Sequence, residues 1–208
     1  MGEKKDMDVK TRLKPRIWNT TTYDRLSRYY DTFMKFFFPL GEKGRARIAG
    51  KLTAGLVLDV ACGTGTLLEM AKKKGLKCYG IDISKGMITQ AKRKIPGAEF
   101  TLASYYRIPY PNGYFDFVVE TNSLSGDFID APKVIREMIR VCKGGGEIYI
   151  AEWPKALEET LKERLIVRLA SFNDDAPKDY LKIFRALGYE PEVEILSKRY
   201  YVFGIKKS

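Results

Sequence analysis

The chain has 208 residues, a length suited to one domain with a substantial core, and 45% of its residues are hydrophobic. It contains no histidine, which excludes a catalytic triad, a general base or a metal site built on imidazole. Because it has no run of about 18 apolar residues and a polar N-terminus, we expect no membrane span, no secretory signal and a cytoplasmic location. Its three cysteines lie in or beside apolar stretches, so we expect reduced structural thiols and no metal.

The formal charge of +11 is concentrated at the two ends of the chain. Residues 1–51 sum to +7 and residues 198–208 to +4, so the stretch between them is neutral. Such basic ends indicate a polyanionic partner, either nucleic acid or an anionic lipid surface, although a solvated basic surface explains the same pattern. The scarcity of Asn and Gln beside many charged residues fits a thermophile.

The first part of the chain is predicted to be an arm followed by helices. Residues 1–19 are charged and poor in apolar side chains, which predicts a basic flexible arm. Residues 20–51 then form an N-terminal helical cap of a single domain that extends over 20–208. Within the cap, helical spacing extends over Thr20–Phe38 and Glu42–Lys51, and the phrase Tyr-Asp occurs twice, seven residues apart.

Strands and helices alternate after the cap. Strands are predicted at Leu56–Val60, Lys77–Ile81, Ala98–Leu102, Phe115–Glu120 and Glu147–Ala151, and helices at Leu67–Lys74, Ser84–Ile95, Ala131–Cys142, Lys155–Ala170 and Pro177–Leu187. Two further strands, Glu190–Leu196 and Arg199–Ile205, are too close for a crossover and must form an antiparallel hairpin. The alternation of strands and helices predicts an α/β fold with a doubly wound, mostly parallel seven-stranded sheet and an antiparallel C-terminal strand.

The stretch Leu56–Leu67 is the clearest indication of a ligand-binding site in the sequence. A buried strand leads into a glycine turn and then a helix, an arrangement that lets a ligand approach the backbone near the helix N-terminus. The rival interpretations are a dinucleotide site, an S-adenosylmethionine site and a structural turn. The turn lacks the third glycine of a dinucleotide motif, and Asp59 would repel a pyrophosphate but suits an ammonium group. The sequence therefore favours a ligand with an amino-acid tail.

A second acid supports this interpretation. Asp82 follows Gly63 by 19 residues and ends the second predicted strand, where a carboxylate can accept hydrogen bonds from both hydroxyls of a ribose.

These motifs together resemble those of a known family. Leu-Asp-Val-Ala-Cys-Gly-Thr-Gly at 58–65, Gly-Ile-Asp-Ile-Ser at 80–84 and Ile-Pro-Tyr-Pro-Asn-Gly-Tyr-Phe-Asp-Phe-Val-Val at 108–119 look like a class I S-adenosylmethionine-dependent methyltransferase. The nearest group includes the ubiquinone/menaquinone and phospholipid N-methyltransferases. The likeness covers about 20–152 and the terminal hairpin, and it implies an enzyme with S-adenosylmethionine as cofactor.

The resemblance also implies roles for individual residues. Gly63 and Gly65 admit the methionine part of the cofactor, Asp59 orders the turn or meets the ammonium, Asp82 holds the ribose and Ile83 packs on the adenine. Where the family usually has an acid for the adenine amino group, this chain has Ser104. The implied cofactor site consists of Tyr23, Asp59, Ala61, Gly63, Gly65, Asp82, Ile83, Ser104 and Glu120.

The methyl acceptor is expected beyond the carboxyl ends of the fourth and fifth strands. We expect Glu120 or Asn122 to accept a hydrogen bond from an amine, Trp153 to stack on a planar group and Tyr30 to line the cofactor's methionine end. Core packing or a structural cap explains the same side chains without a ligand.

The identity of the acceptor depends on the basic ends. The first hypothesis is a base amine of structured RNA such as rRNA, held by the N-terminal arm and Lys206 and Lys207. The alternative is a quinone or phospholipid head group, entering beside Phe33, Phe36, Phe37 and Phe38 while the lysines meet anionic lipid. A non-catalytic protein that binds the cofactor is a third interpretation.

Overall fold

The computed structural model describes residues 20–37, 39–125, 129–153 and 178–208. The predicted arm at residues 1–19 and the predicted helix Lys155–Ala170 lie outside these ranges, as does Phe38.

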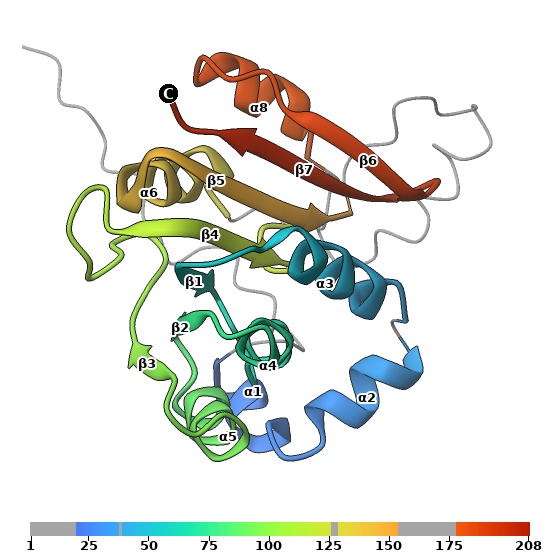
Figure 1. Ribbon diagram of the computed structural model, residues 1–208. Helices are drawn as coiled ribbons and strands as arrows, with labels where there is room; N and C mark the ends of the chain where they lie inside the picture. Colours follow the sequence, from blue (N-terminus) through green and yellow to red (C-terminus); the bar gives the residue numbers. More distant parts are fainter. Residues whose placement is uncertain (1–19, 38, 126–128, 154–177) are drawn as a thin grey trace, which may run out of the picture.

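The described chain is built on one seven-stranded sheet. Its strands are β1 (Leu56–Val60), β2 (Lys77–Asp82), β3 (Glu99–Leu102), β4 (Phe115–Thr121), β5 (Cys142–Glu152), β6 (Glu192–Ser197) and β7 (Tyr200–Lys206). They lie in the order β3-β2-β1-β4-β5-β7-β6, with β1 to β5 parallel and β7 antiparallel to both of its neighbours. Figure 1 shows β4 and β5 pointing one way and β7 the other. The predicted fold class is confirmed.

Helices cover both faces of the sheet. They are α1 (Thr20–Leu26), α2 (Tyr30–Phe37), α3 (Pro39–Lys51), α4 (Thr66–Lys73), α5 (Lys85–Lys94), α6 (Ala131–Val141) and α8 (Tyr180–Ala186). One core cluster joins Leu58 and Val60 to α6 and α8, and the other joins Val57 to α3, α4 and α5. Because side chains alternate along a strand, each residue of β1, β4 and β5 can be assigned to one of these two layers. In Figure 1, α1 and α2 lie with α5 below the sheet.

The helical cap differs from its prediction as one helix over Thr20–Phe38. The chain forms α1 and α2 instead, with a turn between them in which the Tyr29 amide donates to the Leu26 carbonyl at 2.9 Å. The Ser27 hydroxyl donates to the Asp24 carbonyl at 3.0 Å, a local bond of the kind that competes with helix continuation. The break directs the two Tyr-Asp phrases to different partners.

Two other boundaries differ from the sequence prediction. Helix α3 begins at Pro39, which was expected to separate two helices, because the fixed φ of proline suits the first helical position. Strand β5 begins at Cys142, so the glycine run 144–146 belongs to the strand and not to a loop. The register between β4 and β5 shifts there, from Phe115 opposite Cys142 to Phe117 opposite Glu147, which accommodates the extra residues.

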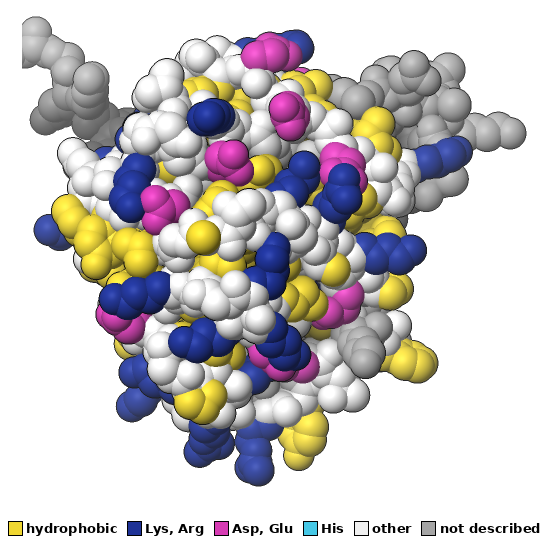
Figure 2. Space-filling view, in the orientation of Figure 1, with side chains coloured by type: hydrophobic (Ala, Val, Ile, Leu, Met, Phe, Trp, Pro, Cys, Tyr) yellow, Lys and Arg dark blue, Asp and Glu magenta, His cyan; other side chains and the backbone are white. Residues whose placement is uncertain are grey.

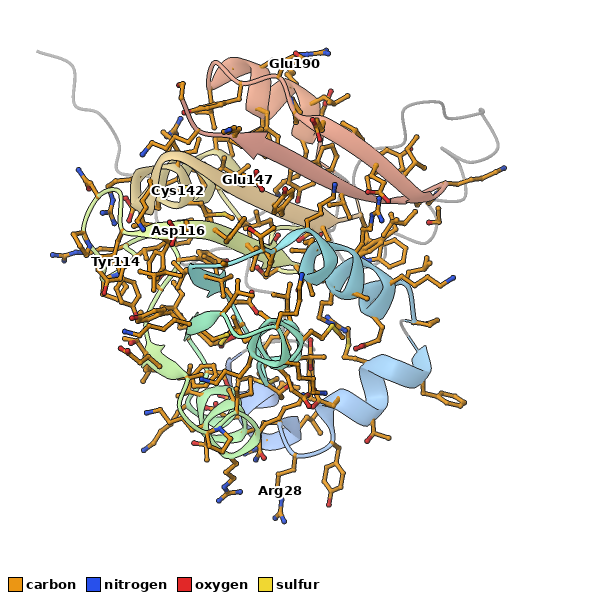
Figure 3. All side chains as sticks on the ribbon, in the orientation of Figure 1. Arg28, Tyr114, Asp116, Cys142, Glu147 and Glu190 are labelled. Carbon is orange, nitrogen blue, oxygen red and sulfur yellow. The ribbon has the colours of Figure 1, made fainter. Side chains whose placement is uncertain are left out.

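The amino ends of the strands are closed by polar contacts. Asp116 accepts hydrogen bonds from the Leu56 amide and from Lys143, at 2.8 and 2.7 Å. Figure 3 shows Asp116 and Cys142 together at this end of the sheet. Within the described part of the chain, no helix is long and apolar enough to cross a membrane.

Candidate functional site

A hollow of about 370 Å³ lies where β1 ends and the glycine turn begins. It is lined by Tyr30, Asp31 and Met34 of α2, Arg45 of α3, Asp59, the turn residues Ala61 to Thr64, Thr66, Leu67 and Thr121. The motif that dominates the sequence therefore opens onto a cavity that the helical cap partly encloses. Tyr30 lines this cavity, and the Tyr23 ring packs against it with the two ring centroids 6.1 Å apart.

The two glycines of the turn, Gly63 and Gly65, are required for different physical reasons. Gly63 has a φ of 54°, and a Cβ built on it would meet no atom within 4 Å, so its face is open. Gly65 has a φ of 81°, and its Cβ would lie 2.7 Å from the Ile95 side chain of the helix after β2. Gly63 thus leaves space for a ligand, whereas Gly65 allows the turn to pack against the protein.

Asp59 lies beneath the turn as a buried carboxyl. Its side chain faces the α3 layer, 2% exposed, and Oδ1 has no hydrogen-bond partner among the described residues. Burial raises the pKa of Asp59 to about 8, against the lowering influence of Arg45. A ligand cation at this point would satisfy the oxygen and stabilise its charged form.

Asp82 ties two loops together. Its carboxylate accepts the Gly63 amide and the Ser84 amide, each at 2.8 Å, so it joins the glycine turn to the start of α5. Burial raises the pKa of Asp82, and these hydrogen bonds counter that effect. Each carboxylate oxygen can accept a further bond, which leaves capacity for hydroxyl groups of a ligand.

The cap holds both loops through its two Tyr-Asp phrases. Asp24 accepts the Ser84 hydroxyl at 2.6 Å and the Gly86 amide at 2.8 Å, at the start of α5. Asp31 accepts the Thr64 hydroxyl and Lys94 Nζ, the latter at 2.7 Å. Burial alone would raise the pKa of Asp31, but the bonds from Lys94 and Thr64 outweigh it and keep the pKa low.

Two apolar side chains stand exposed beside Asp82. Ile83 is 60% exposed and Leu102, across from Asp82 in the β2–β3 register, is 55% exposed. Exposed aliphatic side chains at adjacent strand ends suit a flat apolar ring. Ser104 follows in the next loop, where its Oγ accepts the Tyr106 amide at 3.2 Å.

Glu120 does not line this cavity. It faces the α6–α8 layer with Val118, fully buried, and its Oε1 accepts the Ser123 amide and hydroxyl at 2.6 and 2.8 Å. Glu152 ends β5 on the same face and accepts the Leu124 amide at 2.5 Å. Burial and their mutual repulsion raise the pKa of Glu120. The strand alternation thus separates Glu120 from Tyr30 and Trp153, with which the sequence analysis grouped it, and the two carboxyls hold the loop after β4.

Asn122 and Trp153 lie on the α3 side. Trp153 is half-buried and packs on Tyr200, with ring centroids 4.8 Å apart, so core packing accounts for its position. Asn122 has a φ of 62°, a left-handed conformation that a non-glycine residue adopts at some energetic cost.

The C-terminal lysines lie far from the hollow. Because β7 runs antiparallel to β5, Lys206 pairs with Glu147 near the amino end of the sheet, and Lys207 Nζ donates to the Cys142 carbonyl at 2.7 Å. Lys206 and Lys207, expected to hold phosphates beside the acceptor, therefore lie at the opposite end of the parallel strands from the hollow. The remaining basic residues assigned to that role, in 1–19, are outside the described residues.

Sequence reasoning missed three groups that meet at the hollow: Arg45, Asp31 and Thr64. Arg45 gave no signal because it sits in a helix rich in cations. The repeated Tyr-Asp phrase was a signal for Asp31, but only the break between α1 and α2 shows which partner each aspartate reaches. Within the described residues, no group of His, Cys, Asp and Glu side chains is arranged to hold a metal ion.

The chain matches known proteins over the same region. Residues 58–150 match the family model described as a methyltransferase domain. A demethylmenaquinone methyltransferase of Renibacterium salmoninarum is 35% identical over 105 residues, covering 50% of this chain and 44% of that protein. One of Chlorobaculum parvum is 32% identical over 155 residues, covering 69% and 62%. The chain thus matches less than two thirds of either relative.

Among solved structures, the one described as the DhpI–SAH complex is similar over nearly the whole chain. Its TM-score is 0.69 at 17% identity, and the match covers 91% of this chain and 95% of that one. At this identity the likeness establishes a shared fold.

Proposed function

We propose that this chain, which carries a class I S-adenosylmethionine-dependent methyltransferase domain, transfers a methyl group from S-adenosylmethionine to a small-molecule acceptor of the quinone kind. The observation that carries the proposal is the hollow at the glycine turn, whose lining includes the buried carboxyl of Asp59 with its unpartnered oxygen. Asp82 accepts a hydrogen bond from the same turn and lies beside exposed aliphatic side chains. Ammonium, diol and flat ring occur in this order along S-adenosylmethionine.

The residues present fit that cofactor. Asp59 would meet the ammonium, and Gly63 leaves the space above the turn open. Asp82 would accept hydrogen bonds from the ribose hydroxyls, with Ile83 and Leu102 against the adenine. Tyr30 and Met34 of α2 would cover the methionine end. Ser104 remains a proposed contact for the adenine side.

The chemistry requires little from the protein beyond geometry. When bound, S-adenosylmethionine supplies an electrophilic methyl group on a positively charged sulfur. The chain's own residues orient that group and exclude water, which together account for most of the acceleration in an in-line displacement. An enzyme without histidine can perform this reaction on a nucleophile that is already electron-rich, such as a reduced quinone ring or an amine.

Three observations favour a small apolar acceptor over RNA. The two relatives described above are named as demethylmenaquinone methyltransferases. The C-terminal lysines lie near the amino ends of the parallel strands, whereas the hollow lies at their carboxyl ends. Helix α2, which borders the hollow, and the turn before it also present exposed apolar side chains, Phe36 at 79% and Tyr29 at 70%. Of the other phenylalanines expected at an apolar entrance, Phe38 and the side chains of Phe33 and Phe37 are outside the described set.

The same side of the molecule carries positive charge. Figure 2 shows Lys and Arg side chains gathered along the lower edge of the visible face, around α1 and α5, and Arg28 projects from this edge in Figure 3. Apolar side chains beside cations suit an anionic membrane surface, where a lipid-soluble acceptor would be found.

The test is methyl transfer from labelled S-adenosylmethionine to three acceptor pools: reduced demethylmenaquinone in vesicles, total RNA and phospholipid head groups. We expect label in the quinone and none in RNA. Label confined to RNA would contradict the proposed acceptor and restore the first sequence hypothesis. Binding of S-adenosylmethionine without label in any pool would instead favour a non-catalytic role.

A further inference from the structure

Exposed large apolar side chains gather on the helical cap. Leu26 at the end of α1, Tyr29 in the turn and Phe36 on α2 are 42%, 70% and 79% exposed. Of the other three such residues in the described chain, two stand beside Asp82 at the candidate cofactor site and one, Ile195, lies on β6. Single exposed apolar residues are ordinary, whereas a group of them indicates an interaction surface. Leu26, Tyr29 and Phe36 are called the apolar tip below.

Helix α2 lies between the hollow and the apolar tip. Tyr30 and Met34 of this helix line the hollow. Phe36 follows Met34 by two positions, a rotation of about 200° around the helix axis, so it points away from the hollow. Figure 1 shows α2 at the outside of the molecule, away from the sheet. Phe36 and the hollow are therefore on opposite sides of one helix.

Cations are interleaved with the apolar tip. Arg25 and Arg28 stand on either side of Leu26 in the chain, and both side chains are exposed. Neither forms an ion pair with a residue that the structure describes. Arg28 projects from the lower edge of the molecule in Figure 3. The charge of both guanidinium groups is therefore available to an external anion.

Helix α5 adds positive charge on the same side. It packs against α1 at its start, where a Cβ built on Gly86 would lie 2.7 Å from the Asp24 Cα. Arg93 follows Gly86 by seven residues, about two turns, and so lies on the same face of α5. Arg93 and its neighbour Lys92 are exposed, and the helix contains no acid. Figure 2 shows Lys and Arg gathered around α1 and α5. The basic rim is defined as Arg25, Arg28, Lys92 and Arg93.

We propose that the apolar tip and the basic rim form a membrane-docking surface, which binds anionic phospholipid and places the hollow beside the bilayer. The inference rests on the proposed function and deepens it, because a lipid-soluble acceptor would then pass from the bilayer around α2 to the hollow. The apolar tip enters the boundary between head groups and acyl chains, and the basic rim meets the lipid phosphates.

The composition of the surface favours lipid over RNA. Cations and aromatic rings suit both partners, since bases stack on rings and both partners carry phosphates. Leu26 neither stacks on a base nor binds a phosphate, but it gains free energy when it is buried in an apolar environment. The two acids of the described cap, Asp24 and Asp31, are hydrogen-bonded to Ser84 and Lys94 within the protein.

Flotation of the full chain with vesicles tests the surface without cofactor or acceptor. The protein should bind vesicles of phosphatidylcholine and phosphatidylserine in equal amounts, and only weakly bind pure phosphatidylcholine. Phe36→Ser should weaken binding to the anionic vesicles about three- to tenfold, because an apolar side chain no longer enters the lipid. Arg25→Gln combined with Arg28→Gln should weaken it about 10- to 30-fold at low salt and less at high salt.

The controls remove the same kinds of group from other faces. Ile195→Ser deletes an apolar side chain that is 57% exposed on β6. Lys182→Gln combined with Lys206→Gln deletes two exposed charges, on α8 and β7. Both controls should bind anionic vesicles within about twofold of wild type. Since all of these side chains are exposed, every variant should keep the wild-type Tm.

Entry into the bilayer has a readout of its own. Phe36→Trp should gain fluorescence that is quenched by phospholipids brominated on their acyl chains, whereas Ile195→Trp should gain fluorescence that is not. Quenching of both variants, or of neither, would overturn the proposed orientation.

Other outcomes would also overturn the docking surface. Equal losses in the two charge variants would mean attraction by net charge alone, and unchanged binding of Phe36→Ser would mean that the apolar tip stays in water. Preferential binding of total RNA, when RNA and anionic vesicles compete, would identify RNA as the partner. The proposed function fails separately: a protein that binds vesicles but transfers no label to a quinone contradicts that function and leaves the surface in place.

Discussion

Asp31 on α2 accepts a hydrogen bond from the Thr64 hydroxyl in the glycine turn, although 33 residues separate them in the chain. Seven residues earlier, Asp24 makes the equivalent contact with Ser84 at the start of α5. A short repeat in the sequence therefore becomes two anchors, one on each loop of the candidate cofactor site. The helical cap is fixed to the site through these anchors.

Replacing Asp31 by alanine should loosen the cap over the site. The change removes the acceptor for Thr64 and the partner of Lys94, so we expect affinity for S-adenosylmethionine to fall about 3- to 10-fold. Hydrogen exchange at residues 20–37 should become faster. Asp179→Ala, which removes an exposed helix cap on α8, is the control and should change neither quantity. Unchanged exchange in the Asp31 variant would mean that other contacts hold the cap.

Replacing Asp82 by alanine should weaken cofactor binding more strongly. The variant loses the group proposed to accept the ribose hydroxyls and also frees the Gly63 amide, so we expect at least about a tenfold loss by calorimetry. Asp116→Ala is the matched control. Asp116 also accepts a backbone amide, that of Leu56, but at the opposite end of the sheet (Figure 3), so it should lower stability without changing affinity. Equal affinities for wild type and Asp82→Ala would show that the site is misplaced.

The two turn glycines should respond differently to alanine. Gly65→Ala forces a Cβ into contact with Ile95 and should lower the Tm by about 5 to 10 °C. Gly63→Ala meets no protein atom, so its stability loss should be limited to the cost of the left-handed backbone, about 1 kcal/mol, while cofactor affinity falls. Thermal scans with and without S-adenosylmethionine separate the two effects. A larger Tm loss for Gly63→Ala would contradict the assignment of its open face to a ligand.

Cofactor binding should depend on pH through Asp59. With its pKa raised to about 8, this carboxyl is mostly protonated in the free protein at pH 6 to 7, whereas a ligand ammonium favours the carboxylate. Binding therefore releases a proton, and affinity should rise between pH 5.5 and 7 by up to about tenfold per pH unit. Calorimetry in two buffers of different ionisation enthalpy measures the proton directly. Asp59→Asn should abolish the proton release.

The same carboxyl should lower the stability of the free protein. Its folded pKa lies above the unfolded value of about 3.9, so the folded state keeps a proton that the unfolded state gives up, and stability falls as pH rises from about 4 to about 8. Asp59→Asn removes this penalty and should raise the Tm by a few degrees at pH 8 while weakening cofactor binding. A lower Tm at that pH would indicate that Asp59 has a stabilising partner when charged.

The motifs at 58–65 and 80–84 were sufficient to predict the fold and to indicate a resemblance to a family, because glycine, acid and strand occur there within a few residues of one another. The C-terminal hairpin could also be predicted from the sequence, because two strands joined by so short a connection can only be antiparallel. The cap was misread as one helix because Ser27 and Asp24 interrupt a pattern whose apolar spacing continues.

The sequence by itself determined which chemical groups line the end of β1 and β2, because those groups are part of the local strand, turn and helix. Only the tertiary structure decided which distant groups join them. The alternation of side chains along β4 places Glu120 on the α6–α8 face of the sheet. Because β7 is antiparallel to β5, Lys206 lies near the amino ends of the parallel strands. Packing of α3 through Gly41 brought Arg45 beside Asn122. Such contacts depend on how layers pack across the sheet, which neither composition nor local spacing records.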